Sequence, residues 1–378
     1  MKIAIAAPTY LPARRANTIQ VMKMAQAMVE LGHEVKIAVP NPQLFTYRWE
    51  ELAKHYGLIF EFEVTWLSTR NTFRGYDFSW KVIRWLRHWD ADLLYTRHPQ
   101  TAALASWLGI ATIFEVHDLP TATWIFSRFL RGKGARRLVI ITHALAEDLS
   151  QKFTFDGLSP TFVLIVPDGV DLIRYHNLPS SASARSALSS AEQFTVGYTG
   201  HLYAGRGTEL LLLLAKALPD IQFLLVGGEE ASALALQNKM RSEGLQNVIV
   251  TGFIANADLA LYQAACDVLL MPYQAYVEAS SGGDISRYLS PMKAFEYLAC
   301  GRPIIVSQLP VFREIFNERN AVLVPHDDLS AWIAAIRSLQ SDETQRISLG
   351  EQARQDAQQY DWLSRAARIL NGVKVNVH

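Results

Sequence analysis

Cysteine is scarce in this sequence, and neither sign of charge is in excess. The 378 residues include two cysteines, Cys266 and Cys300, which lie far apart and form no Cys-x-x-Cys pair. This excludes a disulfide framework and fits a reducing compartment. Lys plus Arg and Asp plus Glu both number 36, so the formal net charge is zero. Because a general nucleic-acid-binding protein carries a basic excess, we expect no nucleic-acid partner.

Long hydrophobic runs are absent too. No stretch approaches the roughly 18 uninterrupted apolar residues that a membrane span needs. The first residues, MKIAIAAPTYLPARR, have a short apolar run that Pro8 ends, and charges follow it soon, unlike a signal peptide. We therefore expect a soluble, cytoplasmic protein.

Apolar runs of strand length are frequent instead, and they alternate with amphipathic stretches. In the first half we predict strands at KIAIAAP, HEVKIAVP, DLLYTRH, ATIFEVHD, RLVIIT and FVLIVPD, and in the second half at FTVGYTG, IQFLLVGG, NVIVTGF, DVLLMPY, RPIIVS and AVLVPHD. Runs rich in Val and Ile between helical segments indicate parallel sheets covered on both faces. The predicted fold class is α/β, with two Rossmann-like, parallel-sheet domains that face a central cleft.

The domain boundaries follow from an interruption of this pattern. Residues 172–193 are rich in Ser and Ala and lack strand runs, which is typical of a linker. We predict an N-terminal domain at 1–171, a C-terminal domain at 194–355 and a C-terminal helical segment at 356–378. This last segment has an apolar face, which predicts a packing helix and makes it a candidate to return to the first domain. The face consists of Trp362, Ala366 and Leu370.

A glycine-rich turn, GHLYAGRG, follows the first predicted strand of the second half, at residues 200–207. It is not a Walker A loop, because Arg206 and Gly207 replace the Lys and the Ser or Thr. Neither this turn nor AAPTYLPARR near the N-terminus has the G-x-G-x-x-G pattern of dinucleotide-binding proteins. Two interpretations remain. The glycines serve only chain geometry, or Arg206 and helix N–H groups grip a diphosphate.

A second candidate element has the sequence SSGGDISRYLSPMKAFEYLACG. Ser290 can cap a helix, Pro291 suits its first position and Gly301 ends it. Lys293 and Glu296 then lie three residues apart on one face. They form either a surface salt bridge of little energetic value, or a cation for phosphate and a carboxylate for sugar hydroxyls.

Seven segments, in this order, resemble motifs of the family 4 glycosyltransferases, which have the two-domain GT-B fold. They are GHEVKIAVP, FEVHD, ITHALAEDL, VPDGVDL, YTGHLYAGRGTELLLLLA, VTGFIANADLALYQAACDVLLMPY and SPMKAFEYLACGRPIIVS. The resemblance covers nearly the whole chain.

The resemblance implies that the second domain binds a nucleotide-diphosphate sugar, of the UDP or GDP type. Arg206 stands where a Lys usually holds the diphosphate, and His201 stands where an Arg often helps. Tyr288 replaces the first Glu of the family's E-x7-E motif, whose carboxylate contacts the donor sugar. Among the implied donor-binding residues, Gly252 and Phe253 lie beside the base, Met292 and Lys293 face the phosphates, and Glu296 binds the ribose. The other implied donor-binding residues are Gly200, His201, Arg206 and Tyr288.

In the first domain, His117 of FEVHD matches the family's histidine near the transferred sugar. The implied role is hydrogen bonding to the sugar or the reacting region, not general-base catalysis. The loop after the first strand is where family members shape the acceptor site, and it carries Tyr10, Arg14, Asn17 and Thr18. The alternative for this loop is a capped helix start, with Asn17 or Thr18 as N-cap.

Two aromatic-rich segments each have two interpretations. Residues Trp124–Arg137 are basic with aromatics interleaved, so they form either a solvated helix face or a peripheral contact with anionic lipid at the inner membrane face. The other segment carries Trp80, Trp85 and Trp89, which either pack a helix or line an acceptor groove.

These inferences predict a glycosyltransferase that moves a sugar to a hydroxyl of a glycan, lipid-linked or small-molecule acceptor, and the resemblance implies that the transfer retains the anomeric configuration. We find no Asp-x-Asp or histidine grouping that suggests a metal, and we expect no cofactor. Arg206, Lys293 and His117 are the predicted catalytic residues, with the two cations stabilising the departing diphosphate in a front-face mechanism. The alternatives are a catalytically silent nucleotide-binding subunit, and an epimerase or hydrolase on the same scaffold. A glycosidase needs a carboxylate pair, and no clear pair is present.

Overall fold

The computed structural model describes residues 1–42, 44–69, 75–155, 161–279 and 282–375. The chain forms two compact units. Unit 1 comprises Met1–Gly169 and Trp362–His378, and unit 2 comprises Val170–Asp361. The chain therefore passes between the units twice. Ser280 and Ser281, which open the second candidate element, lie outside the described residues.

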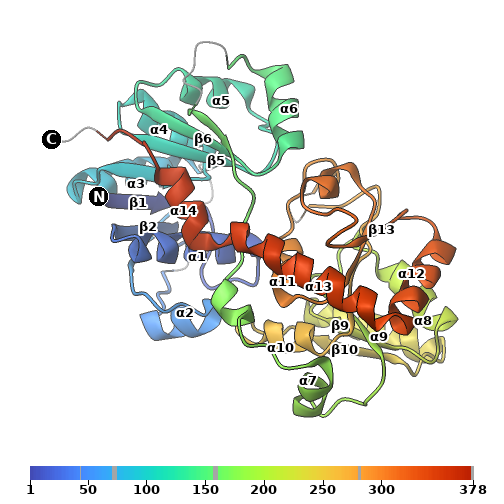
Figure 1. Ribbon diagram of the computed structural model, residues 1–378. Coiled ribbons are helices and arrows are strands. Elements are labelled where there is room, and N and C mark those ends of the chain that lie inside the picture. Colours follow the sequence, from blue (N-terminus) through green and yellow to red (C-terminus); the bar gives the residue numbers. More distant parts are fainter. Residues whose placement is uncertain (43, 70–74, 156–160, 280–281, 376–378) are drawn as a thin grey trace. The chain divides into compact units, whose positions relative to one another are not determined.

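Unit 1 is built on a seven-stranded parallel sheet in the order β3-β2-β1-β4-β5-β6-β7 (Figure 1). The strands are β1 (Lys2–Ala6), β2 (Glu34–Pro40), β3 (Glu63–Leu67), β4 (Leu93–Thr96), β5 (Thr112–Val116), β6 (Ala135–Ile140) and β7 (Val163–Ile165). All but β3 were predicted. This edge strand reads EVTWL and is exposed or half-buried, so it lacks the apolar run that marks the others.

The helices of unit 1 are α1 (Ala16–Glu30), α2 (Trp49–Tyr56), α3 (Tyr76–His88), α4 (Pro99–Trp107), α5 (Thr123–Leu130), α6 (His143–Lys152) and α14 (Trp362–Leu370). Phe78, Val82 and Leu86 of α3 pack with Ala4 and Ala6 of β1 in one apolar cluster. Small side chains on the central strand let the helix approach the sheet closely.

The C-terminal helix α14 belongs to unit 1 and lies beside α1 (Figure 1). Trp362, Ala366 and Leu370 are buried, as the four-residue spacing predicted. The buried guanidinium of Arg137 donates to the carbonyl oxygens of Ile369 and Asn371, at 2.5 and 2.9 Å. A cation therefore satisfies carbonyl groups at the end of α14, where the helix leaves them unpaired.

Unit 2 has a six-stranded parallel sheet in the order β10-β9-β8-β11-β12-β13. The strands are β8 (Thr195–Thr199), β9 (Gln222–Val226), β10 (Val248–Gly252), β11 (Val268–Met271), β12 (Ile304–Ser307) and β13 (Val322–Val324). The helices are η2 (Leu172–Tyr175), α7 (Ser181–Ala187), α8 (Thr208–Ala217), α9 (Glu230–Ser242), α10 (Leu259–Ala264), α11 (Met292–Cys300), η3 (Pro310–Glu314), α12 (Leu329–Ser341), α13 (Glu343–Ala357) and η4 (Gln358–Tyr360).

Both faces of this sheet are buried, which explains its continuous apolar runs. Leu269 and Met271 of β11 join one core cluster, whereas Val268 and Leu270 join the other. Successive side chains of a strand point to opposite faces. The sequence therefore shows no polar alternation along these strands.

The segment at 172–193, predicted as a linker, contributes structure to unit 2. It forms η2 and α7, and Tyr175 and Ala184 pack into one of the core clusters. Ser180 caps α7 by accepting from the backbone N–H of Ser183. A short Ser/Ala-rich helix carries too few apolar residues to stand out by periodicity, which is why composition alone indicated a linker.

In each sheet the strand order reverses beside the first strand, between β1 and β4 in unit 1 and between β8 and β11 in unit 2. Ligands of such sheets bind outside the carboxyl ends of the strands at this switch point. In unit 2, the loops after β8 and β11 are therefore the first place to look for a site.

Candidate functional site

The glycine turn after β8 is pressed against the loop after β11. Gly205 and Gly207 have φ of +80° and +84°. A Cβ on Gly205 would lie 2.0 Å from the Tyr276 carbonyl oxygen, and one on Gly207 would lie 2.0 Å from that of Pro272. Both glycines thus serve chain geometry, as the simpler interpretation held. Their close packing fixes the two loops against each other at the switch point.

Lys293, in the first turn of α11, extends to this switch point. Its Nζ lies 3.7 Å from the ring centroid of Tyr198 and 5.3 Å from that of Tyr273. A Cβ on Gly200 would lie 2.8 Å from Nζ, so the missing side chain leaves room for the ammonium group. Nζ is buried and has no hydrogen-bond partner among the described residues. The salt bridge with Glu296 that the spacing allowed is therefore not formed.

Electrostatics around Lys293 disfavour its charge. Desolvation by burial, followed by the charge of Arg206, holds the pKa of Lys293 well below its usual range, although Glu296 acts in the opposite direction. The Arg206 guanidinium carbon lies 5.0 Å from the Tyr273 centroid, so both cations share one aromatic ring. Two cations converging without a bound carboxylate make a site that suits an anion.

The N-terminus of α11 adds to this positive potential. The helix begins at Met292 with Pro291 as N-cap, and no side chain caps it. The prediction that Ser290 caps the helix is wrong, since its hydroxyl has no hydrogen-bond partner among the described residues. The prediction that Gly301 ends the helix is confirmed by its left-handed conformation, with φ of +66°. The uncapped first turn presents backbone N–H groups beside the two cations.

Glu296 lies one turn further along α11 and is buried. Its carboxylate accepts from Gln263 Nε2 at 3.3 Å and from Asn256 Nδ2 at 3.5 Å. Burial raises its pKa, against the opposing influence of Gln263 and of nearby Arg174. Gln263 is itself held by the Tyr175 hydroxyl, which donates to its Oε1 at 2.8 Å.

This support was missed by the sequence analysis. Gln263 is fully buried on α10 within the apolar run ALYQAAC, and a lone amide in such a run is a signal that was available. The contact of Asn256 with Glu296 spans 40 residues and has no such local signal.

The remaining predicted donor residues also lie in unit 2. His201 stacks on Tyr203, with centroids 4.7 Å apart and planes at 4°. Gly252 ends β10 with φ of +72°, and the next residue, Phe253, is 39% exposed. Tyr288 is half-buried in the turn that precedes α11.

In unit 1, His117 directly follows β5, and its Nε2 lies 2.5 Å from Glu115 Oε1. Tyr10 and Arg14 are exposed in the segment that leads into α1, and Asn17 is exposed in the first turn of α1. Thr18 is fully buried, and its hydroxyl donates to the carbonyl oxygens of Ala13 and Arg15 at 2.8 and 2.7 Å. It therefore offers no accessible group to an acceptor.

The prediction that Asn17 or Thr18 caps α1 is wrong. The N-cap is Arg15, and no side chain provides a cap hydrogen bond. The Thr18 hydroxyl turns back to carbonyl groups before the helix instead. Such local bonds compete with capping.

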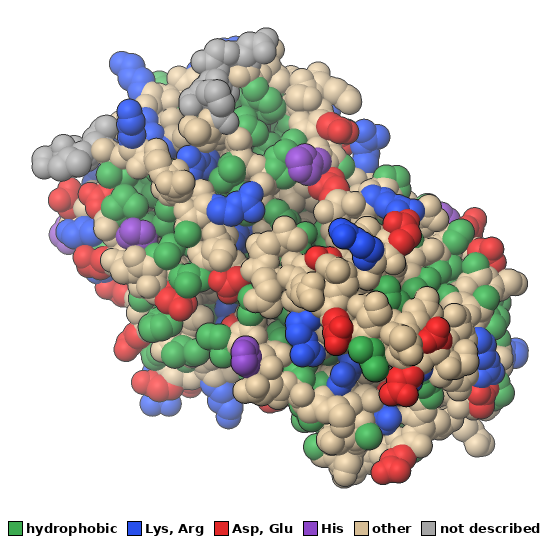
Figure 2. All heavy atoms as spheres, in the orientation of Figure 1, with side chains coloured by type: hydrophobic (Ala, Val, Ile, Leu, Met, Phe, Trp, Pro, Cys, Tyr) green, Lys and Arg blue, Asp and Glu red, His purple; other side chains and the backbone are tan. Residues whose placement is uncertain are grey.

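The basic segment Trp124–Arg137 is only partly available for contacts. Arg137 is buried against α14, and Arg136 donates to the carbonyl oxygen of Lys374 at 2.8 Å. Trp124 and Arg128 are exposed. On the face that Figure 2 shows, positive and negative side chains of the described residues are intermixed, and no broad patch of one sign is visible.

Of Trp80 and Trp85 in α3 and Trp89 directly after it, two pack and one faces solvent. Trp85 and Trp89 stack with their centroids 6.1 Å apart, and Trp80 is 59% exposed. Among the described residues, no helix is long and apolar enough to cross a membrane.

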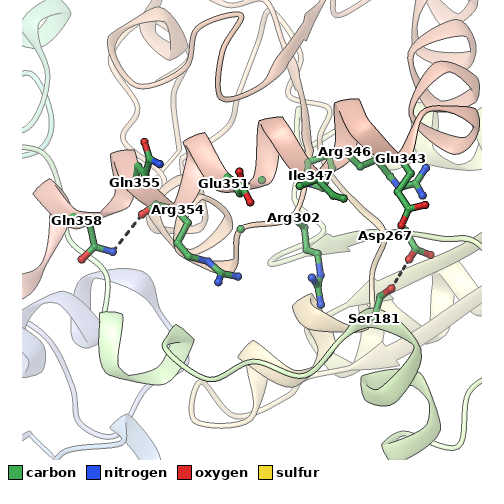
Figure 3. Close-up of a pocket in the computed structure, with 13 residues that line it drawn as sticks. Ser181, Asp267, Arg302, Glu343, Arg346, Ile347, Glu351, Arg354, Gln355 and Gln358 are labelled. Carbon is green, nitrogen blue, oxygen red and sulfur yellow. Dashed lines mark hydrogen bonds between the residues drawn. The ribbon is translucent and has the colours of Figure 1, made fainter.

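A polar depression of about 790 Å³ lies elsewhere in unit 2 (Figure 3). α13 forms one wall, and Arg302, Asp267 and Ser181 lie along the other. Asp267 and Arg302 precede β11 and β12, so this depression is at the amino ends of the strands. Arg302 donates to the carbonyl oxygens of Pro179 and Ala264, and the Ser181 hydroxyl donates to Asp267 at 2.5 Å. These contacts hold the α7 segment, and the candidate site lies at the opposite end of the sheet.

One grouping among the described residues has metal-ligand types close together: Glu115, His117 and Asp168, with ligand atoms within 4.8 Å. However, the Arg365 guanidinium lies 3.1 Å from Glu115 Oε1 and 3.8 Å from Asp168 Oδ1. A fixed cation already lies beside both carboxylates, and a metal ion next to it would be repelled. The grouping therefore does not fit a metal site.

Comparisons with known proteins agree with this arrangement. The family model described as "Glycosyltransferase Family 4" matches residues 18–174, and the one described as "Glycosyl transferases group 1" matches residues 193–342. The D-inositol 3-phosphate glycosyltransferase of Kineococcus radiotolerans is 25% identical over 313 residues, which are 76% of this chain and 67% of that protein. The phosphatidyl-myo-inositol mannosyltransferase of Mycobacterium leprae is 26% identical over 311 residues, 77% of this chain and 75% of that protein.

Solved structures share the fold across nearly the whole chain. Anabaena HepE in complex with UDP has a TM-score of 0.74 at 17% identity, with 98% of each chain covered. Sucrose-phosphate synthase from Thermosynechococcus elongatus has a TM-score of 0.74 at 18% identity, with 97% of each chain covered. The two sheets, the matched family models and these relatives establish that the chain belongs to the family 4, group 1 glycosyltransferases, has their GT-B fold and is a glycosyltransferase.

Proposed function

We propose that the enzyme transfers a sugar from a nucleoside-diphosphate donor to an acceptor hydroxyl, with retention of anomeric configuration. The observation that carries this proposal is the buried, unpartnered ammonium of Lys293, beside Arg206 and the uncapped start of α11. Such a cation costs free energy unless an anion arrives. A diphosphate supplies the missing charge and accepts from the helix N–H groups.

The rest of the donor fits around this anion position. Glu296, held by Gln263 and Asn256, is one turn along the same helix, where its carboxylate can accept from ribose hydroxyls. Gly252 and the exposed Phe253, after β10, are the candidate base contacts. HepE was solved with UDP and with UDP-glucose, so a uridine nucleotide is the first donor to test.

In the proposed reaction, the bond between the anomeric carbon and the diphosphate oxygen breaks while the acceptor oxygen bonds to that carbon on the same face. The acceptor proton goes to the departing diphosphate, so no protein base is required. Lys293 and Arg206 stabilise the negative charge that builds on the leaving group. His117 contributes a hydrogen bond to the sugar.

The acceptor is proposed to be contacted by Tyr10, Arg14 and Asn17. Thr18 is withdrawn from this set because it is buried. Relatives are named for D-inositol 3-phosphate and phosphatidyl-myo-inositol, so phosphorylated and lipid-linked polyols are the acceptors to test first. Lipid contact, if the acceptor needs it, would use Trp124 and Arg128, since Arg136 and Arg137 are engaged.

Thermal unfolding in the presence of UDP, GDP, ADP and their sugars tests the donor site, because a ligand of the folded state raises the midpoint. We expect one nucleoside diphosphate to raise it in the wild-type protein, and the rise to disappear in Arg206→Ala. Arg337→Ala, which removes an exposed ion pair with Asp220 in the same unit, is the matched control. Equal shifts in both variants would exclude the phosphate assignment.

His201 and Tyr288 stand where family members have Arg and Glu. These two replacements are the reason to consider the alternative of a catalytically silent subunit. It predicts nucleotide binding without turnover. Donor-dependent transfer that is lost in Arg206→Ala would exclude it.

A further inference from the structure

Five polar side chains from distant parts of unit 1 meet in its interior. The Glu115 cluster consists of Gln20, Arg97, Glu115, Asp168 and Arg365. Glu115 and Arg365 have side-chain exposures of 0% and 2%. The two guanidinium nitrogens Nη1 and Nη2 of Arg365 lie 3.2 and 3.1 Å from the two carboxylate oxygens of Glu115, which is the fork geometry of a bidentate pair.

The other members hold this pair in place. Gln20 Nε2 donates to Glu115 Oε1 at 2.7 Å, and Arg97 Nη1 donates to Gln20 Oε1 at 3.2 Å. Asp168 Oδ1 lies 3.8 Å from Arg365 Nη2 and shares its charge. The Glu115 carboxylate therefore has one fixed orientation.

The Glu115 carboxylate also binds His117, the histidine that the proposed function places at the transferred sugar. His117 Nε2 lies 2.5 Å from Glu115 Oε1, and the histidine side chain is 13% exposed. Burial opposes ionisation of Glu115, but the charge of Arg365 and the hydrogen bond with His117 outweigh it and lower its pKa. Because an ionised carboxylate only accepts, the shared proton belongs to His117 Nε2.

A purely structural role does not account for this arrangement. A buried ion pair adds little stability compared with apolar residues of the same shape. Here one oxygen of the pair is also committed to a partly exposed imidazole at the carboxyl end of β5. We propose that Glu115 and Arg365 are positioning residues for His117: they fix its ring orientation and keep the proton on Nε2 during sugar transfer. This inference rests on the proposed function, in which His117 contacts the transferred sugar.

The position of Arg365 gives the proposal a further consequence. Arg365 lies in α14, three residues after Trp362, where the chain re-enters unit 1, and Asp168 directly precedes Gly169, the last residue before the chain leaves unit 1. The two points at which the chain passes between the units therefore both lie next to residues of the Glu115 cluster, which contacts His117. The C-terminal helix α14 therefore helps to orient the His117 imidazole.

NMR of the imidazole protons tests the positioning without any substrate. In the wild-type protein we expect an observable downfield Nε2–H signal from His117, protected from exchange by Glu115 and assigned through its absence in His117→Gln. In Glu115→Gln and Arg365→Lys, both of which preserve side-chain size, we expect this signal to move upfield or disappear. Arg137→Lys is the matched control, because Arg137 also anchors α14 but does not touch Glu115. The control should retain the signal.

Kinetics test the consequence for the reaction. With the donor and acceptor that give turnover, we expect kcat to fall at least tenfold in Glu115→Gln and Arg365→Lys, the KM for donor to change less than twofold, and Arg137→Lys to match the wild type. A missing wild-type signal, an unchanged signal in both variants, or a changed signal with unchanged kcat would each overturn the inference. If the wild-type protein shows no transfer, the proposed function fails, while the NMR result still decides whether Arg365 and Glu115 hold His117.

Discussion

The two units have the same strand order around their first strands, yet one buried cation in each, Arg365 in unit 1 and Lys293 in unit 2, is compensated in opposite ways. In unit 1, Arg365 and Glu115 form a bidentate pair in the interior. In unit 2, Lys293 has a buried Nζ with no hydrogen-bond partner among the described residues. The first arrangement is electrostatically complete within the folded chain, whereas the second lacks an anion. An unfinished electrostatic arrangement is a better indication of a ligand than topology, because both units have the topology.

The loops that follow the first strands, β1 in unit 1 and β8 in unit 2, also differ. After β8, glycines at 200, 205 and 207 all have positive φ, and the chain packs closely on the loop after β11. The described glycines of positive φ in unit 1 include none between β1 and α1. The same strand–helix connection is thus built for close backbone approach in one unit and for exposed side chains in the other.

The sharpest test of the comparison is to remove each buried cation. Arg365→Met leaves the buried Glu115 carboxylate without its bidentate cation, so we expect the free energy of unfolding to fall by about 3–5 kcal/mol. The double variant Arg365→Met/Glu115→Gln should recover most of this loss. Urea unfolding, followed by a signal from unit 1, measures both. A single variant as stable as the wild type would show that the pair is not electrostatically coupled.

Lys293→Met should not lower the free energy of unfolding of the free protein, in contrast to Arg365→Met. It removes a buried amine whose charged form is disfavoured by burial and by Arg206 and which has no hydrogen-bond partner among the described residues, so we expect equal or higher stability without ligand. Affinity for the nucleoside diphosphate should fall roughly ten- to hundredfold, the value of a hydrogen bond to a charged group. Urea unfolding and calorimetric titration give the two numbers. A loss of stability in the free protein would remove the contrast between the units.

Gly205→Ala tests whether close approach, and not backbone conformation alone, matters in the turn. Its Cβ would lie 2.0 Å from the Tyr276 carbonyl oxygen. Gly244→Ala is the matched control, with a similar φ of +69° and nothing within 4 Å. We expect both variants to lose about 1 kcal/mol from positive φ, and Gly205→Ala to lose about 1–3 kcal/mol more. Equal losses in urea unfolding would mean that the loops can separate freely.

The smallest expected effect is a pH dependence of donor binding. The pKa of Lys293 is lowered in the free protein, mainly by desolvation. A bound diphosphate raises it, so binding takes up part of a proton. Affinity should therefore fall as pH rises above the free-protein pKa of Lys293, by less than tenfold per unit. Calorimetry above pH 7.5, in buffers of different ionisation enthalpy, measures the uptake, which should vanish in Lys293→Met.

Much of the fold was predictable because it depends on residues that are close together in the sequence. Apolar runs of strand length marked every strand except β3, whose exposed edge position removes the apolar signal. The end of α11 at Gly301 was predictable for the same reason, since a left-handed residue is a local requirement. The Ser290 cap failed because the chain enters α11 through Pro291 in an extended conformation.

The supporting residues of the candidate site could not be predicted in the same way. Arg365 meets Glu115 across 250 residues, and Gln263 meets Glu296 across 33. Neither contact leaves a mark on the spacing of apolar residues. Thr18 shows the converse difficulty, because nothing in the sequence distinguishes a buried hydroxyl that binds carbonyl groups from an exposed one that binds a ligand. Burial depends on packing between segments that are distant in the chain.

The division of unit 1 into two stretches bears on how the chain matures on the ribosome. Unit 2 is one continuous stretch, so all of it can fold as soon as it has emerged, since domains generally fold as units. Unit 1 begins first but waits for Arg365, the partner of Glu115, until all of unit 2 has been synthesised. We expect nascent chains that stop at Asp361 to have a protease-resistant unit 2 and a labile N-terminal region, and chains extended through Leu370 to protect both. The half of the protein that is made first would thus be the last to acquire its native interior.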